Sequence, residues 1–124
     1  MKIGIILACY NSIMGNAYDV LRARRGDKDL RGVDLSGEVI SGADLSYADL
    51  RGANLSEAYL NYADLSFANL SDANLSNADL SDANLEGTIL IGAYIQNTDF
   101  SDAIGISMDS IFDKKESSGL LVGA

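Results

Sequence analysis

Large apolar residues recur at every fifth position through most of this chain. The series runs from Leu30 to Phe100, and leucine fills every place in it between Leu45 and Leu90. A small residue usually stands two places earlier, and from Ala43 to Ala83 that residue is alanine nine times in succession. A period of five fits neither an α-helix nor a β-strand. Because one such segment cannot bury its apolar line alone, the pattern predicts copies stacked into a solenoid.

The repeats divide the chain into an N-terminal cap over 1–27, a repeat body over 28–103, and a C-terminal cap and tail over 104–124. Apolar side chains at helical spacing predict a helix near 12–25, which Gly26 is suited to end. Ser107 is placed to begin a short second helix whose Met108, Ile111 and Phe112 share one face. Helices at both ends would cover the open backbone edges of the stack.

Units such as Ala43-Asp44-Leu45-Ser46-Tyr47 and Ala68-Asn69-Leu70-Ser71-Asp72 follow one another in phase fifteen times. They resemble the pentapeptide-repeat family, whose consensus is Ala-(Asp/Asn)-Leu-X-X. The resemblance implies an all-β solenoid, specifically a right-handed quadrilateral β-helix with four repeats per coil and about four coils in this chain. The central leucine and the alanine would point inward, and residues twenty apart would be vertical neighbours.

The second residue after each leucine falls at a corner of such a coil. Glycine, asparagine or aspartate fills most corners and suits the left-handed conformation that a type II turn requires there. Four corners carry other residues, and we expect type I-like turns at these: Tyr47, Glu57, Tyr62 and Phe67.

Four inward positions carry a charged or hydroxyl-bearing side chain in place of the consensus alanine. Lys28 and Glu38 both fall in the first coil, where an unpaired buried charge is costly. We therefore expect an irregular first coil, with both charged groups reaching its open end or each other. Thr88 and Thr98 are milder departures whose hydroxyl groups need hydrogen-bond partners.

The chain is acidic, with a formal net charge of −9 and a pI near 4.2, which argues against direct binding of nucleic acid or of an anionic membrane. No apolar run approaches the length of a membrane span. There is no histidine, no glycine-rich phosphate loop and no cysteine pattern for a metal. The carboxylates lie on flat outward faces without the desolvation that acid–base catalysis requires. We therefore predict no catalytic, cofactor-binding or metal-binding residues, and no enzyme activity.

Outward-facing apolar residues form the candidate interaction surface. Tyr47 and Phe67 are twenty apart and should stack on one corner, with Tyr62 on the adjacent corner and Tyr59 close to it. A second group near the C-terminal end contains Ile89, Ile91 and Tyr94. Exposed clusters of this kind are enriched at interfaces. Alternatively, the aromatic ladder only stabilises the coil, and the second group lies beneath the C-terminal helix.

The first functional hypothesis is a non-catalytic scaffold that binds an unidentified protein partner through a side or an end of the β-helix. The resemblance implies a bacterial protein of cyanobacterial type, either a monomer or an end-to-end homodimer. The second hypothesis is DNA mimicry that modulates DNA gyrase, as in the fluoroquinolone-resistance members of the family. Residues available for dimerisation at the C-terminal end are Ile104, Ile106, Leu120, Leu121 and Val122.

The N-terminal segment leaves two locations open. We expect a cytoplasmic protein in which the apolar run over 3–10 packs on the end of the repeat body. The alternative is export, because Lys2, the apolar run and the small residues Gly15-Asn16-Ala17 together match a short signal peptide over 1–17. The single cysteine, Cys9, is compatible with either compartment.

Overall fold

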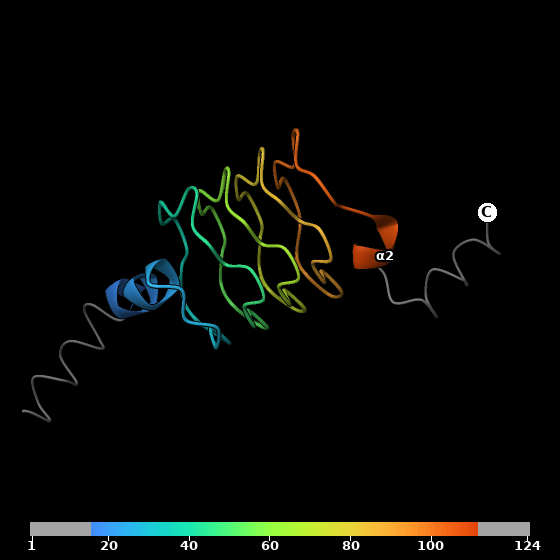
Figure 1. Ribbon diagram of the computed structural model, residues 1–124. Coiled ribbons are helices and arrows are strands. Elements are labelled where there is room, and N and C mark those ends of the chain that lie inside the picture. The colour runs from blue at the N-terminus through green and yellow to red at the C-terminus, as the bar shows by residue number, and fades with distance from the viewer. Residues whose placement is uncertain (1–15, 112–124) are drawn as a thin grey trace, which may run out of the picture.

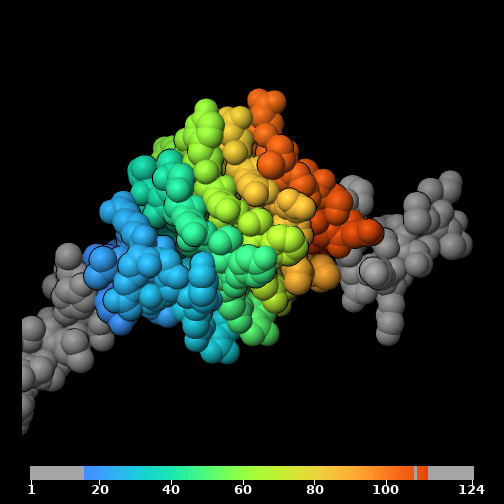
Figure 2. All heavy atoms as spheres, viewed as in Figure 1, coloured from blue at the N-terminus to red at the C-terminus, as the bar shows by residue number. Residues whose placement is uncertain are grey.

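The computed structural model describes residues 16–111. Coils of backbone stack along one axis, with a helix over 16–24 at one end and the short helix α2, Met108–Ile111, at the other (Figure 1). In the space-filling view, successive coils form adjacent bands from the blue N-terminal helix to the orange C-terminal end (Figure 2).

The stacking register is 20 residues. Parallel bridges join Asp29 to Asp49 and Asp49 to Asn69, and the other outward rows repeat the same interval up to Ile104. Each bridge is held by backbone hydrogen bonds in both directions along the stack. For example, Leu50 N–H donates to Asn69 O at 2.8 Å, while Asn69 N–H donates to Ala48 O at 2.9 Å. Residues twenty apart are therefore vertical neighbours, so four five-residue repeats make one coil, as the sequence predicts.

Leucine and alanine fill the centre of the column. Every leucine of the five-residue series from Leu30 to Leu90 is at most 1% exposed, and so is every alanine of its own series from Ala48 to Ala83. Ile95 and Phe100, in the last repeats, are only partly buried. The inward orientation predicted for both series is confirmed, and the core is one continuous apolar column along the stacking axis.

The prediction of type I-like turns at four corners is wrong. The corner residues Tyr47, Glu57, Tyr62 and Phe67 have φ of 61°, 60°, 63° and 59°, in the same left-handed region as the glycine corners. At the Tyr47 corner, Tyr47 N–H donates to Ser66 O in the next coil at 2.9 Å, and Ala48 N–H closes the turn on Leu45 O at 3.1 Å. These repeating hydrogen bonds impose the type II turn, even though a left-handed conformation costs an L-residue about 1–2 kcal/mol.

The first coil is also more regular than we predicted. Its bridges from Asp29 and Asp34 keep the 20-residue register, and its corners have the same left-handed φ as those of later coils. Lys28 is exposed and donates from Nζ to Ser46 O at 2.7 Å, while the half-buried Glu38 accepts from Asn16 Nδ2 at 2.8 Å. Because Glu38 meets the N-terminal helix and Lys28 reaches a backbone carbonyl, neither charge disturbs the backbone.

The threonine prediction is confirmed. Thr88 is 2% exposed, and its hydroxyl donates to Leu65 O at 2.7 Å. The hydroxyl of Thr98 donates to Leu75 O at the same distance. Each threonine therefore satisfies its polar atom on the backbone of the coil beneath it.

The N-terminal helix packs across the first coil. Val20 and Ala23 are buried against the column, and Arg24 donates from its guanidinium to Val39 O at 2.9 Å. Gly26, with φ of 84°, ends the helix, because Gly26 N–H donates to Ala23 O and Asp27 N–H donates to Arg22 O. This pair of bonds is a Schellman motif. The predicted residues 12–15 of this helix lie outside the described range.

At the other end, α2 follows directly after the chain leaves the column. Leu90 N–H donates to Ser110 O at 2.6 Å, which ties α2 to the last coil, and Ile111 is partly buried against the core. Phe112 and the tail, including Leu120, Leu121 and Val122, lie outside the described residues. Between residues 16 and 111, no helix is long and apolar enough to cross a membrane.

Candidate interaction surface

Three large aromatic side chains border one side of the column. This side, which we call the aromatic-bordered face, has the vertical row Asp44, Asp64 and Asn84 at its middle. Tyr62 occupies the corner where the chain enters this side, and Tyr47 and Phe67 occupy the corner where it leaves. The repeat forms this arrangement because Tyr62 and Phe67 lie five residues apart, at the two ends of the segment that contains Asp64.

The aromatic rings at the exit corner form a ladder. Tyr47 and Phe67 stack with ring centroids 5.2 Å apart and an interplanar angle of 16°, as predicted from their separation of twenty residues. Phe67 in turn lies over Gly87 of the next coil, where an added β-carbon would stand 2.5 Å from Phe67 Cδ1. Glycine at this corner therefore leaves space for the Phe67 ring of the preceding coil.

These rings are largely open to solvent. Tyr47 is 68% exposed, Tyr62 is 67% exposed and Phe67 is 50% exposed. The stack thus covers only part of each ring at the exit corner, and most of the Tyr62 side chain at the entry corner remains accessible.

The other predicted surface residues lie elsewhere. Tyr59 stands above Val39 on the preceding side of the column, and both are exposed. Ile89 is bridged to Asn69 and Tyr94 to Asn74, which places them on two further sides; Ile91 follows at the corner between these two. Ile89, Ile91 and Tyr94 are 40%, 37% and 59% exposed. All seven candidate residues are therefore exposed, and Tyr59 adjoins the aromatic-bordered face.

The carboxylates of the aromatic-bordered face are held in a fixed orientation. Ser46 donates to Asp44 Oδ1 from both its hydroxyl, at 2.6 Å, and its backbone N–H, at 3.1 Å. Ser66 makes the same two bonds to Asp64 Oδ1, at 2.6 Å and 3.0 Å. The Ser46 hydroxyl, the Ser46 backbone N–H and the positive charge of Lys28 lower the pKa of Asp44 below its usual value. Among residues 16–111, no hydrogen bond involves Oδ2 of Asp44 or Asp64.

Basic residues are confined to the N-terminal part of the column. Residues 16–51 contain seven acidic and six basic side chains, whereas residues 52–111 contain nine acidic and none that is basic. Each of the six already contacts its own chain. Arg31 pairs with Asp29 at 2.9 Å and Arg51 pairs with Asp49 at 2.7 Å, and the Arg31 hydrogen bonds lower the pKa of Asp29 to about 2. The carboxylates beyond Arg51 therefore lack a basic partner within the described part of the chain.

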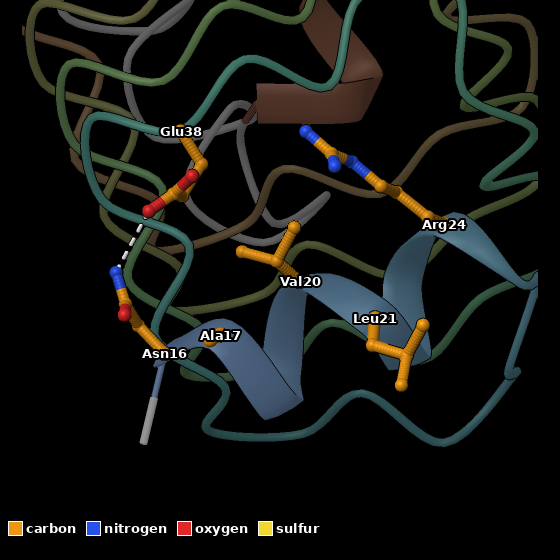
Figure 3. Close-up of a pocket in the computed structure, with 6 residues that line it drawn as sticks. All are labelled: Asn16, Ala17, Val20, Leu21, Arg24 and Glu38. Atoms are coloured by element: carbon orange, nitrogen blue, oxygen red, sulfur yellow. Dashed lines mark hydrogen bonds between the residues drawn. The ribbon is translucent and has the colours of Figure 1, made fainter. Parts of the chain in front are cut away.

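The structure also contains a cavity that the sequence did not predict. It has a volume of about 420 Å³ and lies between the N-terminal helix and the first coil, lined by Asn16, Ala17, Val20, Leu21, Arg24 and Glu38 (Figure 3). All three polar side chains that line it already have partners, because Asn16 donates to Glu38 and Arg24 donates to Val39 O. Its position depends on how the helix packs, which the repeat pattern does not encode. Over residues 16–111, no group of three His, Cys, Asp or Glu side chains could hold a metal ion.

Comparison with known families gives a direct match. The family model for pentapeptide repeats matches residues 40–77 and 68–104, in eight copies. This chain belongs to the pentapeptide-repeat family. The membership implied by the consensus units is thereby confirmed, and it implies a right-handed quadrilateral β-helix, in agreement with the 20-residue register. Proteins of this family are generally structural or scaffold proteins.

Several solved structures resemble this pentapeptide-repeat protein. A pentapeptide repeat protein from the thylakoid lumen of Arabidopsis thaliana is 28% identical, with a TM-score of 0.50 over 77% of this chain and 76% of that one. Another from Nostoc PCC 7120 is 33% identical, with a TM-score of 0.35 over 77% of this chain and 83% of that one. QnrB1, a plasmid-mediated fluoroquinolone resistance protein, is 20% identical, with a TM-score of 0.30 over 77% of this chain and 63% of that one. No curated protein sequence matches this chain.

Proposed function

We propose that this pentapeptide-repeat protein is a non-catalytic scaffold that binds another protein through the aromatic-bordered face. The observation that carries the proposal is the coincidence of strain and exposure in three aromatic residues. Tyr47, Tyr62 and Phe67 all have left-handed backbone conformations, all are at least half exposed, and all border the same side.

The left-handed backbone conformation costs folding free energy at an aromatic residue, and this cost indicates that the three rings have a function. Eleven of the fifteen corners carry glycine, asparagine or aspartate, which are the residues that tolerate positive φ best. A bulky aromatic residue at such a corner costs about 1–2 kcal/mol, and strained residues of this kind concentrate at functional sites. Stacking of Tyr47 on Phe67 offsets part of this cost by about 0.5–1.5 kcal/mol. No stacked aromatic partner accompanies Tyr62 within residues 16–111.

Ile89, Ile91 and Tyr94 form a second candidate contact in this proposal. Ile89 lies on the side that begins at the Phe67 corner, and Tyr94 lies on the side after that, so one partner molecule would have to extend across this corner to contact both groups. The aromatic-bordered face is the stronger candidate because it combines apolar area with ordered carboxylates.

The proposal is tested by quantitative affinity capture from extracts of the native host with the full chain as bait. A Tyr47→Gly/Tyr62→Gly/Phe67→Gly variant removes all three rings at corners where glycine is conformationally favoured. Glu57→Gly/Asn77→Gly/Asn97→Gly changes three stacked corners elsewhere and is the matched control. We expect specific partners to be lost from the first variant and kept by the second. Identical partner lists for wild type and both variants would refute binding through this face.

DNA mimicry that modulates DNA gyrase is the second candidate function. It is favoured by the excess of negative charge beyond Arg51, where residues 52–111 carry nine acidic and no basic side chains. Duplex DNA likewise presents a dense negative charge to proteins that bind it. A supercoiling assay with purified DNA gyrase and micromolar protein decides between the candidates. Inhibition or protection of the enzyme supports mimicry, and unchanged supercoiling contradicts it.

We propose a cytoplasmic location for this scaffold, with export as the alternative. The two are distinguished by the intact mass of the protein isolated from its native host. Loss of residues 1–17 would establish a cleaved signal peptide and contradict the cytoplasmic assignment.

A further inference from the structure

We infer that the aromatic-bordered face binds an extended, arginine-bearing segment of a partner protein. This inference rests on the proposed function, because it specifies the chemistry of the partner that the scaffold would hold. Its basis is the position of the ordered Asp64 carboxylate between the Tyr62 and Phe67 corners, with the ordered Asp44 carboxylate one coil away. The three described segments that form this side, 43–47, 63–67 and 83–87, contain no basic residue.

The carboxylates provide the first half of the recognition. Asp44 and Asp64 are bridged vertical neighbours, one coil apart. In each, Oδ1 is occupied by the serine two residues later, and Oδ2 makes no hydrogen bond within the described chain. The serine bonds fix the direction of the carboxylate, so little side-chain entropy remains to be lost when a cation binds.

The rings provide the second half. Tyr62 and Phe67 lie at the two ends of the side that carries Asp64, so a group that approaches Asp64 passes beside an aromatic surface. A guanidinium group binds a carboxylate through two parallel N–H donors and also stacks on an aromatic ring. Lysine has a compact ammonium group that matches this combination less well. The face therefore favours arginine over lysine.

The surrounding charges define where the segment lies. Lys28 donates from Nζ to Ser46 O at the N-terminal border of the face, and its positive charge acts on Asp44. Toward the C-terminal end, Asp82 lies at the entry corner and Glu86 lies next to the Gly87 corner, and both are exposed. A basic segment is therefore attracted to the coils containing Tyr62, Phe67, Asp82 and Glu86 and is repelled from the border near Lys28. An anionic partner would be disfavoured over the same area.

The test uses three fluorescein-labelled peptides and the full chain. The peptides are four repeats of Gly-Ser-Arg, four repeats of Gly-Ser-Lys, and four repeats of Gly-Ser-citrulline, which keeps the shape of arginine without its charge. Fluorescence anisotropy at low and physiological salt gives the affinities. We expect the arginine peptide to bind about threefold or more tightly than the lysine peptide, since a cation–π contact at an exposed site has about this effect. The citrulline peptide should not bind.

Variants then locate the site. Tyr62→Gly/Phe67→Gly should weaken binding of the arginine peptide about fivefold or more and remove the preference over lysine. Asp64→Asn should weaken both charged peptides. Two matched controls, Glu57→Gly at another corner and Asp34→Asn on another side, should leave the preference for arginine unchanged. Circular dichroism of each variant verifies that it is folded.

The outcomes separate the inference from the function on which it rests. Equal affinity for the arginine and lysine peptides, or equal losses in the Tyr62→Gly/Phe67→Gly variant and the controls, overturns the inference. If host partners still depend on the three aromatic residues in the capture experiment, the scaffold function stands without it. Arginine-selective binding through Tyr62 and Phe67, combined with unchanged partner lists, supports the recognition chemistry and contradicts the proposed function alone.

Discussion

Replacement of Gly87 by alanine tests whether the Phe67 ring of the aromatic ladder packs directly against the backbone at Gly87. Gly87 has φ of 68°, and its added β-carbon would stand 2.5 Å from Cδ1 and 2.6 Å from Cε1 of Phe67. The substitution therefore introduces a left-handed alanine and also displaces the Phe67 ring. Gly52→Ala is the matched control, because Gly52 has φ of 69° and nothing lies within 4 Å of its added β-carbon.

Both substitutions place an alanine in a left-handed conformation, and only Gly87→Ala also displaces the Phe67 ring. A left-handed alanine costs about 1–2 kcal/mol, and the smaller entropy of the unfolded chain returns about 0.4–1 kcal/mol, so Gly52→Ala should destabilise by about 1 kcal/mol. Gly87→Ala should cost about 1 kcal/mol more, because moving the Phe67 ring disrupts its 5.2 Å stack on Tyr47. The total expected loss at Gly87 is about 2 kcal/mol.

Urea unfolding of the full chain, followed by circular dichroism, measures both changes. Repeating the pair in a Phe67→Ser background provides the decisive comparison, since the extra cost at Gly87 should disappear once the ring is gone. If Gly87→Ala were no more destabilising than Gly52→Ala, or if its extra cost persisted without Phe67, the Phe67 ring would not pack against Gly87 as the structure indicates.

Three further predictions concern the column itself. Leu70→Ala should destabilise by about 3–5 kcal/mol in urea unfolding, because Leu70 is 0% exposed in the middle of the core; a loss below 1 kcal/mol would contradict a close-packed centre. Thr88→Val should cost about 1 kcal/mol, because it removes the 2.7 Å bond to Leu65 O while Ala68 N–H still donates to that carbonyl; no change would mean that the bond adds nothing. Asp29→Asn should lower the melting temperature at pH 7, and its difference from wild type should shrink as the pH falls from about 4 to 2. The pKa of Asp29 in the folded protein is about 2, below the ordinary aspartate value of 3.8. The stabilisation by Asp29 is therefore fully present above the ordinary pKa and is lost as the pH falls through the folded-state pKa. A difference that stays constant over that interval would show that the pairing with Arg31 does not stabilise the fold.

The features of the fold that follow directly from the five-residue period were predictable from the sequence. The burial of the leucine and alanine series, the 20-residue register and the stacking of Tyr47 on Phe67 all follow from a strict five-residue repeat. The hydroxyl partners of Thr88 and Thr98 were expected because a buried donor must be satisfied. These features need only the knowledge that equivalent residues lie above one another.

The errors arose where contacts between coils or caps outweigh local preference. Tyr62 adopts φ of 63° because its N–H donates to Ser81 O in the next coil, and this bond is invisible to turn statistics. Glu38 is satisfied by Asn16, which is 22 residues away on the N-terminal helix. For the candidate surface, the sequence identified the aromatic residues. The unused carboxylate oxygens between them depend on the serine hydrogen bonds, which required the structure.

The confinement of Arg and Lys to the first part of the described column has a kinetic consequence. Between residues 16 and 111, a formal charge of −1 over 16–51 gives way to −9 over 52–111, so the molecule carries a lengthwise electric dipole. A cationic protein diffusing toward it would be turned and drawn to the more negative portion before any contact forms. Its association rate should fall steeply with ionic strength while its dissociation rate changes little.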